Sequence, residues 1–154
     1  MGSSLLVDAN LLVLCAVGAV SPALIARHKR LNAYVENDYK VLSDFMAGYD
    51  SIAVTPNALS EASNIARYIA EPARSKVAMI LARIAETSKE FYVPSARAVA
   101  RSEYRYLGLT DAAMLEVMDV HLLTDDLDLF VAAESQGKTC FNFTHLREAA
   151  GITS

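Results

Sequence analysis

The chain has 154 residues, of which 53% are hydrophobic and 21% are charged. A chain of this length can bury a sizeable core as one domain, and its few glycines and prolines exclude a disordered or fibrous protein. The formal net charge of −4 excludes a generally basic nucleic-acid-binding surface but leaves room for a local one. We therefore predict a single domain over residues 1–154.

Short apolar runs alternate along the chain with longer stretches of helical periodicity. In chain order we expect a strand at 4–7, helices at 10–20 and 36–46, a strand at 51–54, helices at 56–69 and 75–85, a strand at 90–93, short helices at 94–100 and 103–106, a helix at 110–118, a strand at 122–124, a helix at 129–135, a strand at 139–143 and a helix at 146–150. Strands separated by helices are typical of βαβ units. The sequence predicts an α/β fold, a three-layer α/β/α sandwich with a mainly parallel central sheet.

Single residues mark the expected ends of several helices. Thr55 followed by Pro56 is a favourable N-cap and first helical residue, and Thr110 is expected to cap the helix that follows it. Gly48 and Gly137 are expected to end the helices before them.

Acidic residues follow two of the expected strands, at the edge where open parallel sheets bind ligands. Asp8 comes directly after the first strand, where an Asp is also a common turn or helix-cap residue. Asp125, Asp126 and Asp128 follow the fourth strand. A solvated acidic turn that caps the next helix is the alternative for this cluster.

Two further acidic residues lie on expected helices. Glu61 falls between Ala58 and Ile65 on the apolar side of its helix, so its carboxylate should be paired, protonated or bound to a cation unless it reaches water. Asp111 shares a face with Leu115, although the helix dipole alone favours an acid in a first turn. Four acidic positions could thus meet at one edge of the sheet and suit Mg²⁺ or Mn²⁺.

Taken together, these segments resemble the motifs of PIN-domain nucleases in order and spacing, from about Ser4 to Phe143. The matching segments are Leu5 to Asn10, Thr55 to Glu61, Leu109 to Ala112, and Leu122 to Asp128. The resemblance implies a metal-dependent endoribonuclease that uses Mg²⁺ or Mn²⁺. The residues that it implies are Asp8, Glu61, Asp111 and Asp126 as catalytic metal ligands, Asp128 as a fifth acid, and Asn10 and Thr124 as supporting groups.

The resemblance also implies partners. RNA is the expected substrate, and many compact PIN proteins are toxins of bacterial toxin–antitoxin pairs that form homodimers. An antitoxin protein and a homodimer are therefore expectations for this chain. The residues expected to contact RNA are Arg27, Lys29, Arg30, Arg67 and Arg101, for which a solvated basic face is the alternative.

Two other functions compete with a nuclease. A phosphohydrolase of the haloacid dehalogenase type also places an Asp after its first strand, but it needs a second Asp where this chain has Asn10. No Lys precedes the late acidic cluster either. A PIN-fold module that binds RNA or protein without catalysis is the other alternative.

The sequence predicts a cytoplasmic protein that does not enter the membrane. Its longest apolar stretch, Leu11 to Val20, is shorter than the roughly 20 residues of a membrane span, and no basic segment precedes it as in a signal peptide. Cys15 and Cys140 lie far apart in apolar runs, without the spacing of zinc ligands, and are expected to be buried thiols.

Overall fold

A computed structural model describes residues 3–152 and contains one five-stranded sheet. All neighbouring strands pair in parallel, in the order β3-β2-β1-β4-β5. The strands are β1 (Ser4–Val7), β2 (Ser51–Val54), β3 (Lys89–Glu90), β4 (His121–Thr124) and β5 (Cys140–Asn142).

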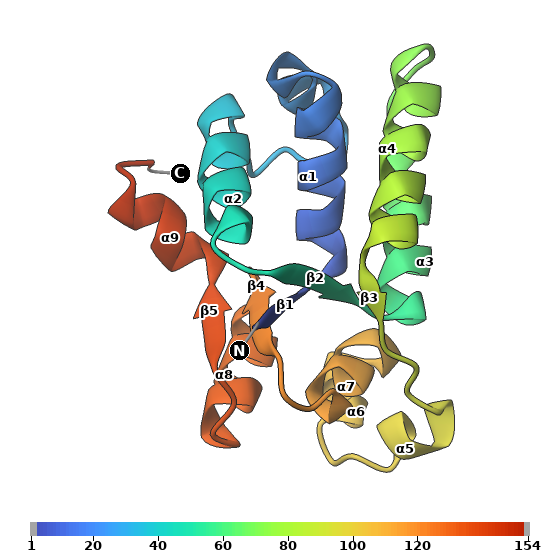
Figure 1. Cartoon of the computed structure of the whole chain (residues 1–154), viewed down its shortest axis with the longest axis vertical. Coiled ribbons are helices and arrows are strands. Elements are labelled where there is room, and N and C mark those ends of the chain that lie inside the picture. Colours follow the sequence, from blue (N-terminus) through green and yellow to red (C-terminus); the bar gives the residue numbers. More distant parts are fainter. Residues whose placement is uncertain (1–2, 153–154) are drawn as a thin grey trace.

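Helices cover both faces of the sheet (Figure 1). On one face lie α1 (Ala9–Val20), the 3₁₀ helix η1 (Pro22–Arg27), α2 (Glu36–Ala47), α3 (Pro56–Ala66), α4 (Ala73–Thr87) and α9 (Phe143–Ala149). On the other lie α5 (Ser95–Val99), α6 (Tyr104–Leu107), α7 (Leu109–Glu116) and α8 (Leu127–Ser135). This arrangement confirms the predicted three-layer α/β/α sandwich with a parallel central sheet. Within residues 3–152, no helix combines the length and the apolar character that a bilayer crossing requires.

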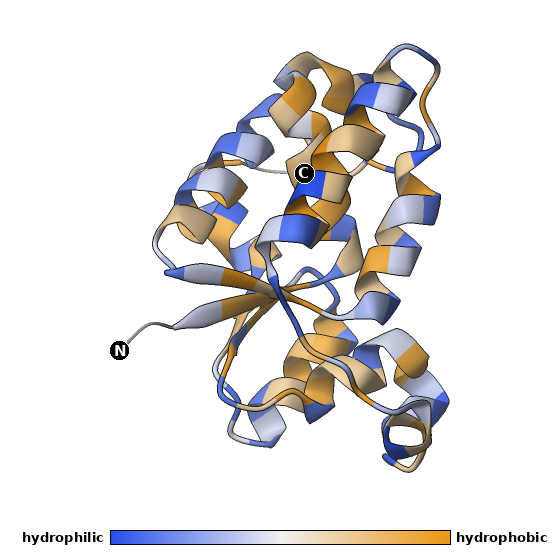
Figure 2. Cartoon of the chain, turned by 45° about the vertical axis from the view of Figure 1, so that its right-hand side comes forward, coloured by the Kyte–Doolittle hydropathy of each residue, from blue (hydrophilic) through white to orange (hydrophobic). Residues whose placement is uncertain are grey.

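The strands divide their side chains between two apolar cores, because successive residues of a strand point to opposite faces. Leu5, Val7 and Leu123 belong to the larger core, beneath α1, α3 and α4. Leu6 and Leu122 belong to the smaller core, against α7 and α8. Figure 2 shows hydrophobic stretches within the central strands, which lie between two layers of helices that carry both hydrophobic and hydrophilic residues. Burial on both faces is what a parallel sheet requires.

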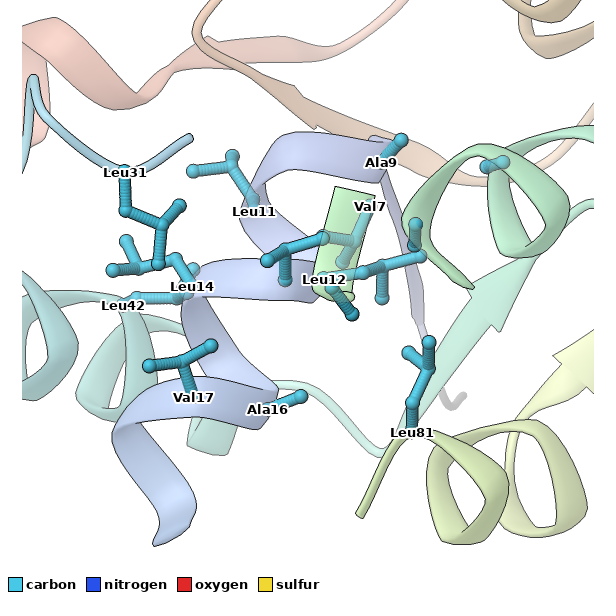
Figure 3. Packing of buried hydrophobic residues seen from close by; sticks show 14 of the residues in the cluster. Val7, Ala9, Leu11, Leu12, Leu14, Ala16, Val17, Leu31, Leu42 and Leu81 are labelled. Atoms are coloured by element: carbon cyan, nitrogen blue, oxygen red, sulfur yellow. The ribbon is translucent and has the colours of Figure 1, made fainter. Parts of the chain in front are cut away.

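Helix α1 forms the centre of the larger core and is apolar nearly all round, as the sequence predicts. It packs against α2, α3 and α4, and Leu12 and Leu14 are fully buried. In Figure 3, Leu14 lies beside Leu31 and Leu42, which come from the loop before α2 and from α2 itself. A helix surrounded in this way holds its first residue, Ala9, in a fixed place directly after β1.

The strand order creates a topological switch point between β1 and β4. From β1 the chain builds β2 and β3 on one side, and later returns to build β4 and β5 on the other. Val7 pairs with Leu123, so the residues that follow them, Asp8 directly after β1 and Thr124 at the end of β4, lie side by side. Open α/β sheets bind ligands at the crevice beyond such a point.

Capping side chains mark the starts of α1, α3, α8 and α9. Thr55 accepts a hydrogen bond from the Ala58 amide at 3.1 Å, which confirms the predicted N-cap of α3. Asn142 accepts one from Thr144 at 2.9 Å, so β5 ends and α9 begins earlier than expected. Because Asp126 caps α8, that helix begins at residue 127 instead of 129.

Two elements of the structure differ from those expected, because tertiary packing and backbone geometry override the local sequence pattern. The third strand is confined to two residues, since Phe91 and Val93 pack against the smaller core instead of extending the edge of the sheet. The expected N-cap role of Thr110 is wrong. Gly108, with φ of +86°, ends α6 and precedes α7. Only glycine adopts this left-handed backbone readily, so the glycine sets the start of α7.

Candidate active site

Asp8 is nearly buried where β1 meets α1, and both of its carboxylate oxygens accept hydrogen bonds. Oδ1 accepts from the Leu11 amide at 3.2 Å and so caps α1. Oδ2 accepts from the Thr124 hydroxyl and from the Asp125 amide, the latter at 3.3 Å. The helix-cap reading of Asp8 is therefore correct, and it coexists with a position at the switch point.

The end of β4 turns toward Asp8 through Thr124. This residue is fully buried, and its hydroxyl donates to Asp8 while its oxygen accepts from the Asp126 amide at 3.0 Å. The Asp126 carboxylate in turn accepts from the Leu129 amide at 3.1 Å and caps α8. One threonine thus fixes the relative positions of two acidic residues that come from opposite halves of the chain.

A small pocket of about 120 Å³ opens at this junction. Its lining residues are Asp8, Ala9, Asn10, Glu61, Ile65, Thr110, Asp111 and Asp126. We call it the acidic pocket, because it brings together all four acids of the expected quartet. It is smaller than the roughly 300–1,000 Å³ pockets that enclose small organic ligands, so its size suits an ion with a few water molecules.

Two carboxyl groups of the acidic pocket, those of Asp8 and Asp111, have raised pKa values. Burial, followed by the negative charges of Asp125 and Asp111, raises the pKa of Asp8 to about 7, against the lowering effect of its hydrogen bonds. Burial, with the charges of Asp126 and Glu61, raises the pKa of Asp111 to about 7 as well. Four acids therefore repel one another in a space from which water is partly excluded.

The donor set of the acidic pocket fits a hard divalent cation. Carboxylate oxygens are the ligands that Mg²⁺ and Mn²⁺ prefer, and a cation would offset the burial and the repulsion that raise the pKa values of Asp8 and Asp111. Among residues 3–152, no three His, Cys, Asp or Glu side chains are already close enough to hold an ion. The cap of α1 holds one oxygen of Asp8, and the cap of α8 holds one oxygen of Asp126.

The other expected members of the site lie at different depths. Glu61 was expected on the core-facing side of its helix, but it is exposed. Helix α3 turns Ala58 and Ala62 to the core and leaves Glu61 at the edge of the pocket. Asn10 is exposed and lines the pocket. Asp128 is exposed in the first turn of α8 and is not among the lining residues.

Sequence reasoning missed two contributors to this site. Thr110 lines the pocket although it was expected only to cap a helix. The Asp125 amide donates a hydrogen bond to Asp8, and the charge of Asp125 contributes to the raised pKa of Asp8. The position of Thr110 directly before Asp111 was the one available signal for its role.

Most of the expected RNA-contacting residues also meet in one place. A second pocket of about 750 Å³ is lined by Arg27, Lys29, Asn64, Arg67, Tyr68, Ile69, Ala70 and Arg74, and we call it the basic pocket. Arg30 stacks over the Tyr68 ring, 5.1 Å from its centroid. Tyr68 and Arg74 are members that sequence reasoning missed.

Arg101 does not join the basic pocket. Its guanidinium pairs with Glu116 and Glu103 and donates to Gln136 at 2.6 Å, on the opposite side of the sheet among α6, α7 and α8. With its charge neutralised by two carboxylates, Arg101 holds helices together and offers little to a phosphate.

Comparison with known proteins gives no further assignment: neither a scan against protein-family models nor a search of curated proteins finds a match to this chain.

Proposed function

We propose that this chain is a PIN-type endoribonuclease that requires Mg²⁺ or Mn²⁺. The observation that carries the proposal is the meeting of Asp8, Glu61, Asp111 and Asp126 in one pocket at the switch point of a parallel sheet. These residues come from four separate elements, and nothing in helix or strand formation requires them to converge. Burial and neighbouring carboxylates raise the pKa values of Asp8 and Asp111, so keeping these two acids ionised in the pocket costs stability.

These four carboxylates would hold the cation. A bound Mg²⁺ or Mn²⁺ supplies a nucleophile from water near neutral pH and neutralises charge that develops on a phosphoryl oxygen. Thr124 and the Leu11 amide fix both oxygens of Asp8, so this carboxylate is oriented in advance. Glu61 and Asn10, which are exposed at the mouth of the pocket, would face the incoming substrate.

The chain offers less to the competing phosphohydrolase chemistry. That chemistry uses the Asp after the first strand, here Asp8, as a covalent nucleophile. The position two residues later holds Asn10, which cannot act as an acid or base. An antitoxin partner and a homodimer follow from the family resemblance and belong to the proposal with it. The cytoplasmic location expected from the sequence belongs to it as well.

Cleavage of RNA by the purified protein tests the proposal. We expect a pool of single-stranded RNA to be cut in Mg²⁺ or Mn²⁺ and left intact in EDTA. Asp8→Asn should lower the cleavage rate by about a hundredfold or more, because it removes one ligand charge from the centre of the pocket. Thermal denaturation of the variant reports whether it folds.

Asp128→Asn is the matched control. It removes the same charge from an exposed acid two residues after Asp126 that lies outside the acidic pocket, so cleavage should stay within about twofold of the parent rate. Cleavage that survives both EDTA and Asp8→Asn would reject the proposal.

A further inference from the structure

The basic pocket is built from two segments that are distant in the sequence and fastened together. The Lys29 amide donates to the Tyr68 carbonyl at 3.2 Å, and the buried His28 ring lies 3.3 Å from the Ala66 carbonyl through Nε2. The Arg74 side chain donates through Nε to the carbonyls of Arg67 and Ile69, at 3.1 and 3.0 Å. These bonds hold the walls of the pocket in place before any ligand binds.

Four cations line this pocket, namely Arg27, Lys29, Arg67 and Arg74. The nearby Glu71 carboxylate accepts two hydrogen bonds from Ser75 at 3.0 and 2.9 Å. These bonds, and the charges of Arg74 and Arg67, lower the pKa of Glu71. One carboxylate therefore faces several cations, and the surplus positive charge suits a ligand with more than one negative group.

Tyr68 adds an aromatic surface to the same pocket. Its side chain is 48% exposed, and the Arg30 guanidinium lies over its ring. Exposed aromatic rings beside cations stack nucleic-acid bases, while the cations hold the phosphates. A volume of about 750 Å³ lies in the upper part of the range for pockets that enclose small organic ligands.

Helix α3 connects the basic pocket to the acidic pocket. Glu61 and Ile65 line the acidic pocket, whereas Asn64 and Arg67 line the basic one. The six steps from Glu61 to Arg67, the C-cap of α3, span about 9 Å at 1.5 Å per step. A strand held in the basic pocket would therefore pass the acidic pocket within a few nucleotides.

We propose that the basic pocket binds single-stranded RNA on one side of the bond that is cut. Arg27, Lys29 and Arg67 contact its phosphates, and Tyr68 stacks on a base. The inference rests on the proposed function, because that function identifies the polyanion as a substrate strand. A single strand is specified because its bases are free to stack, whereas those of an RNA helix are not.

Binding in EDTA tests this pocket without cleavage. We would measure the fluorescence anisotropy of a labelled, mixed-sequence oligoribonucleotide over a series of salt concentrations. Arg67→Glu should weaken binding roughly tenfold and lower the salt slope by about 0.7 for each phosphate contact that is lost. Arg67→Lys should retain most of the affinity. Lys29→Glu gives a second, independent reversal of charge should Arg67→Glu fail to fold.

Arg83→Glu is the matched control for net charge. Arg83 is exposed on α4 and lies outside the basic pocket. Its substitution by Glu changes the charge of the protein by the same amount as Arg67→Glu. Its affinity should stay within about twofold of the parent protein. An equal loss in Arg83→Glu and Arg67→Glu would overturn the proposal, because it would trace binding to total charge.

Tyr68→Leu separates stacking from charge. It should weaken binding of the single strand about tenfold at an unchanged salt slope, and leave binding of an RNA duplex unaffected. An equal effect on both RNAs would overturn the stacking role. A labelled poly-glutamate peptide that binds as tightly as the RNA would also overturn the proposal, in favour of an acidic protein partner.

The two proposals fail in different ways. RNA binding that is intact in EDTA, without cleavage in Mg²⁺ or Mn²⁺, would reject the nuclease and leave RNA binding by this pocket standing. Metal-dependent cleavage with unaltered binding and KM in Arg67→Glu and Lys29→Glu would leave the nuclease standing and reject the pocket.

Discussion

Asp8 serves two purposes whose demands conflict. As the N-cap of α1 it accepts the Leu11 amide, a role that favours a charged carboxylate at the positive end of a helix. As a nearly buried acid beside Asp125 and Asp111, it is favoured in its neutral form. Burial, together with repulsion from Asp125 and Asp111, outweighs the effect of the cap, since the pKa of Asp8 rises to about 7.

This conflict predicts that stability depends on pH. In the unfolded chain Asp8 and Asp111 titrate near 3.8, whereas in the folded protein both pKa values are about 7. Between these values the folded state binds more protons than the unfolded state, so stability falls as pH rises from about 4 to about 7. In EDTA, we expect the protein to be less stable at pH 8 than at pH 5 by about 1–4 kcal/mol.

Thermal or urea denaturation over this pH range measures the effect. Asp8→Asn replaces a titrating group by a neutral one, so its stability curve should be flatter through the same range. Stability that rises steadily from pH 5 to pH 8 in the parent protein would contradict the assigned pKa values.

Residue-level prediction succeeded where the position depends on local sequence. Asp8 and Asp126 follow strands that their apolar runs reveal, so their place at the sheet edge was predictable. The partners of Arg101 were not, because Glu116 lies 15 residues away and Gln136 lies 35 residues away. The exposure of Glu61 depends on how α3 is rotated against α1, which its own sequence does not determine.

At the scale of elements, α1 and α2 pack closely at Gly18. A Cβ added there would lie only 2.1–2.8 Å from atoms of the Tyr39 side chain on α2. We expect Gly18→Ala to destabilise the protein by about 1–3 kcal/mol despite the better helix propensity of alanine, because the ring must move out of a packed core.

Denaturant unfolding of Gly18→Ala beside Gly48→Ala measures this packing. Gly48 caps the end of α2, has φ of −75°, and its added Cβ would meet only the Phe45 carbonyl at 3.4 Å. Gly48→Ala should therefore change stability by less than about 0.5 kcal/mol. Equal effects of the two substitutions would show that α1 and α2 can separate without cost.

A buried ion pair joins α2 to α9. Arg147 donates to both carboxylate oxygens of Asp38 at 2.8 and 2.7 Å, and Asp38 is fully buried. Arg147→Met should destabilise the protein by about 3–5 kcal/mol, because it leaves the Asp38 charge buried without its partner. Chemical denaturation of this variant gives the value.

Lys40→Met is the control for that ion pair. Lys40 and Asp44 also form an ion pair on α2, but their side chains are 77% and 67% exposed, so their loss should cost less than about 1 kcal/mol. Similar losses from Lys40→Met and Arg147→Met would mean that burial does not determine the strength of either pair.

Helices with strong local signals were predicted better than elements defined by tertiary contacts. The starts of α2 and α3 follow from charge, capping and periodicity within a few residues. The third strand was predicted too long, because Phe91 and Val93 fit both a strand and a core-facing loop. Local sequence could not decide between them, since the smaller core that takes up both side chains forms from distant helices.

At the scale of the whole molecule, the net charge of −4 does not reveal two regions of opposite charge, an acidic pole at the acidic pocket and a basic pole at the basic pocket. The acidic pocket gathers four carboxylates, and the basic pocket gathers four cations, on neighbouring faces of α3. Composition reports only their sum. Alternating strands and helices predicted the parallel sheet. The acidic pocket, however, depends on the strand order, and the basic pocket depends on how distant helical segments pack.

The acidic pole predicts that a divalent cation stabilises the entire fold. Mn²⁺ that binds only the folded state should stabilise it by about 2.7 kcal/mol at a concentration a hundred times its Kd. A thermal-shift titration at pH 7.5 measures this effect. Glu61→Gln should reduce the shift, whereas Asp128→Asn should leave it unchanged, because Glu61 lines the acidic pocket and Asp128 does not. A shift that is the same in both variants would mean that the ion binds elsewhere.

The strand order also fixes when the site can exist during synthesis of the chain. Asp8 is made early, but the amide that it binds belongs to Asp125, 117 residues later. At 5–20 residues per second, a ribosome needs roughly 6 to 23 s to add that length. Throughout this interval β1 has no β4 beside it and the acidic pocket lacks one wall. Under the proposed nuclease function, the protein could not attack the messenger that encodes it until most of its chain has been made and β4 has paired with β1.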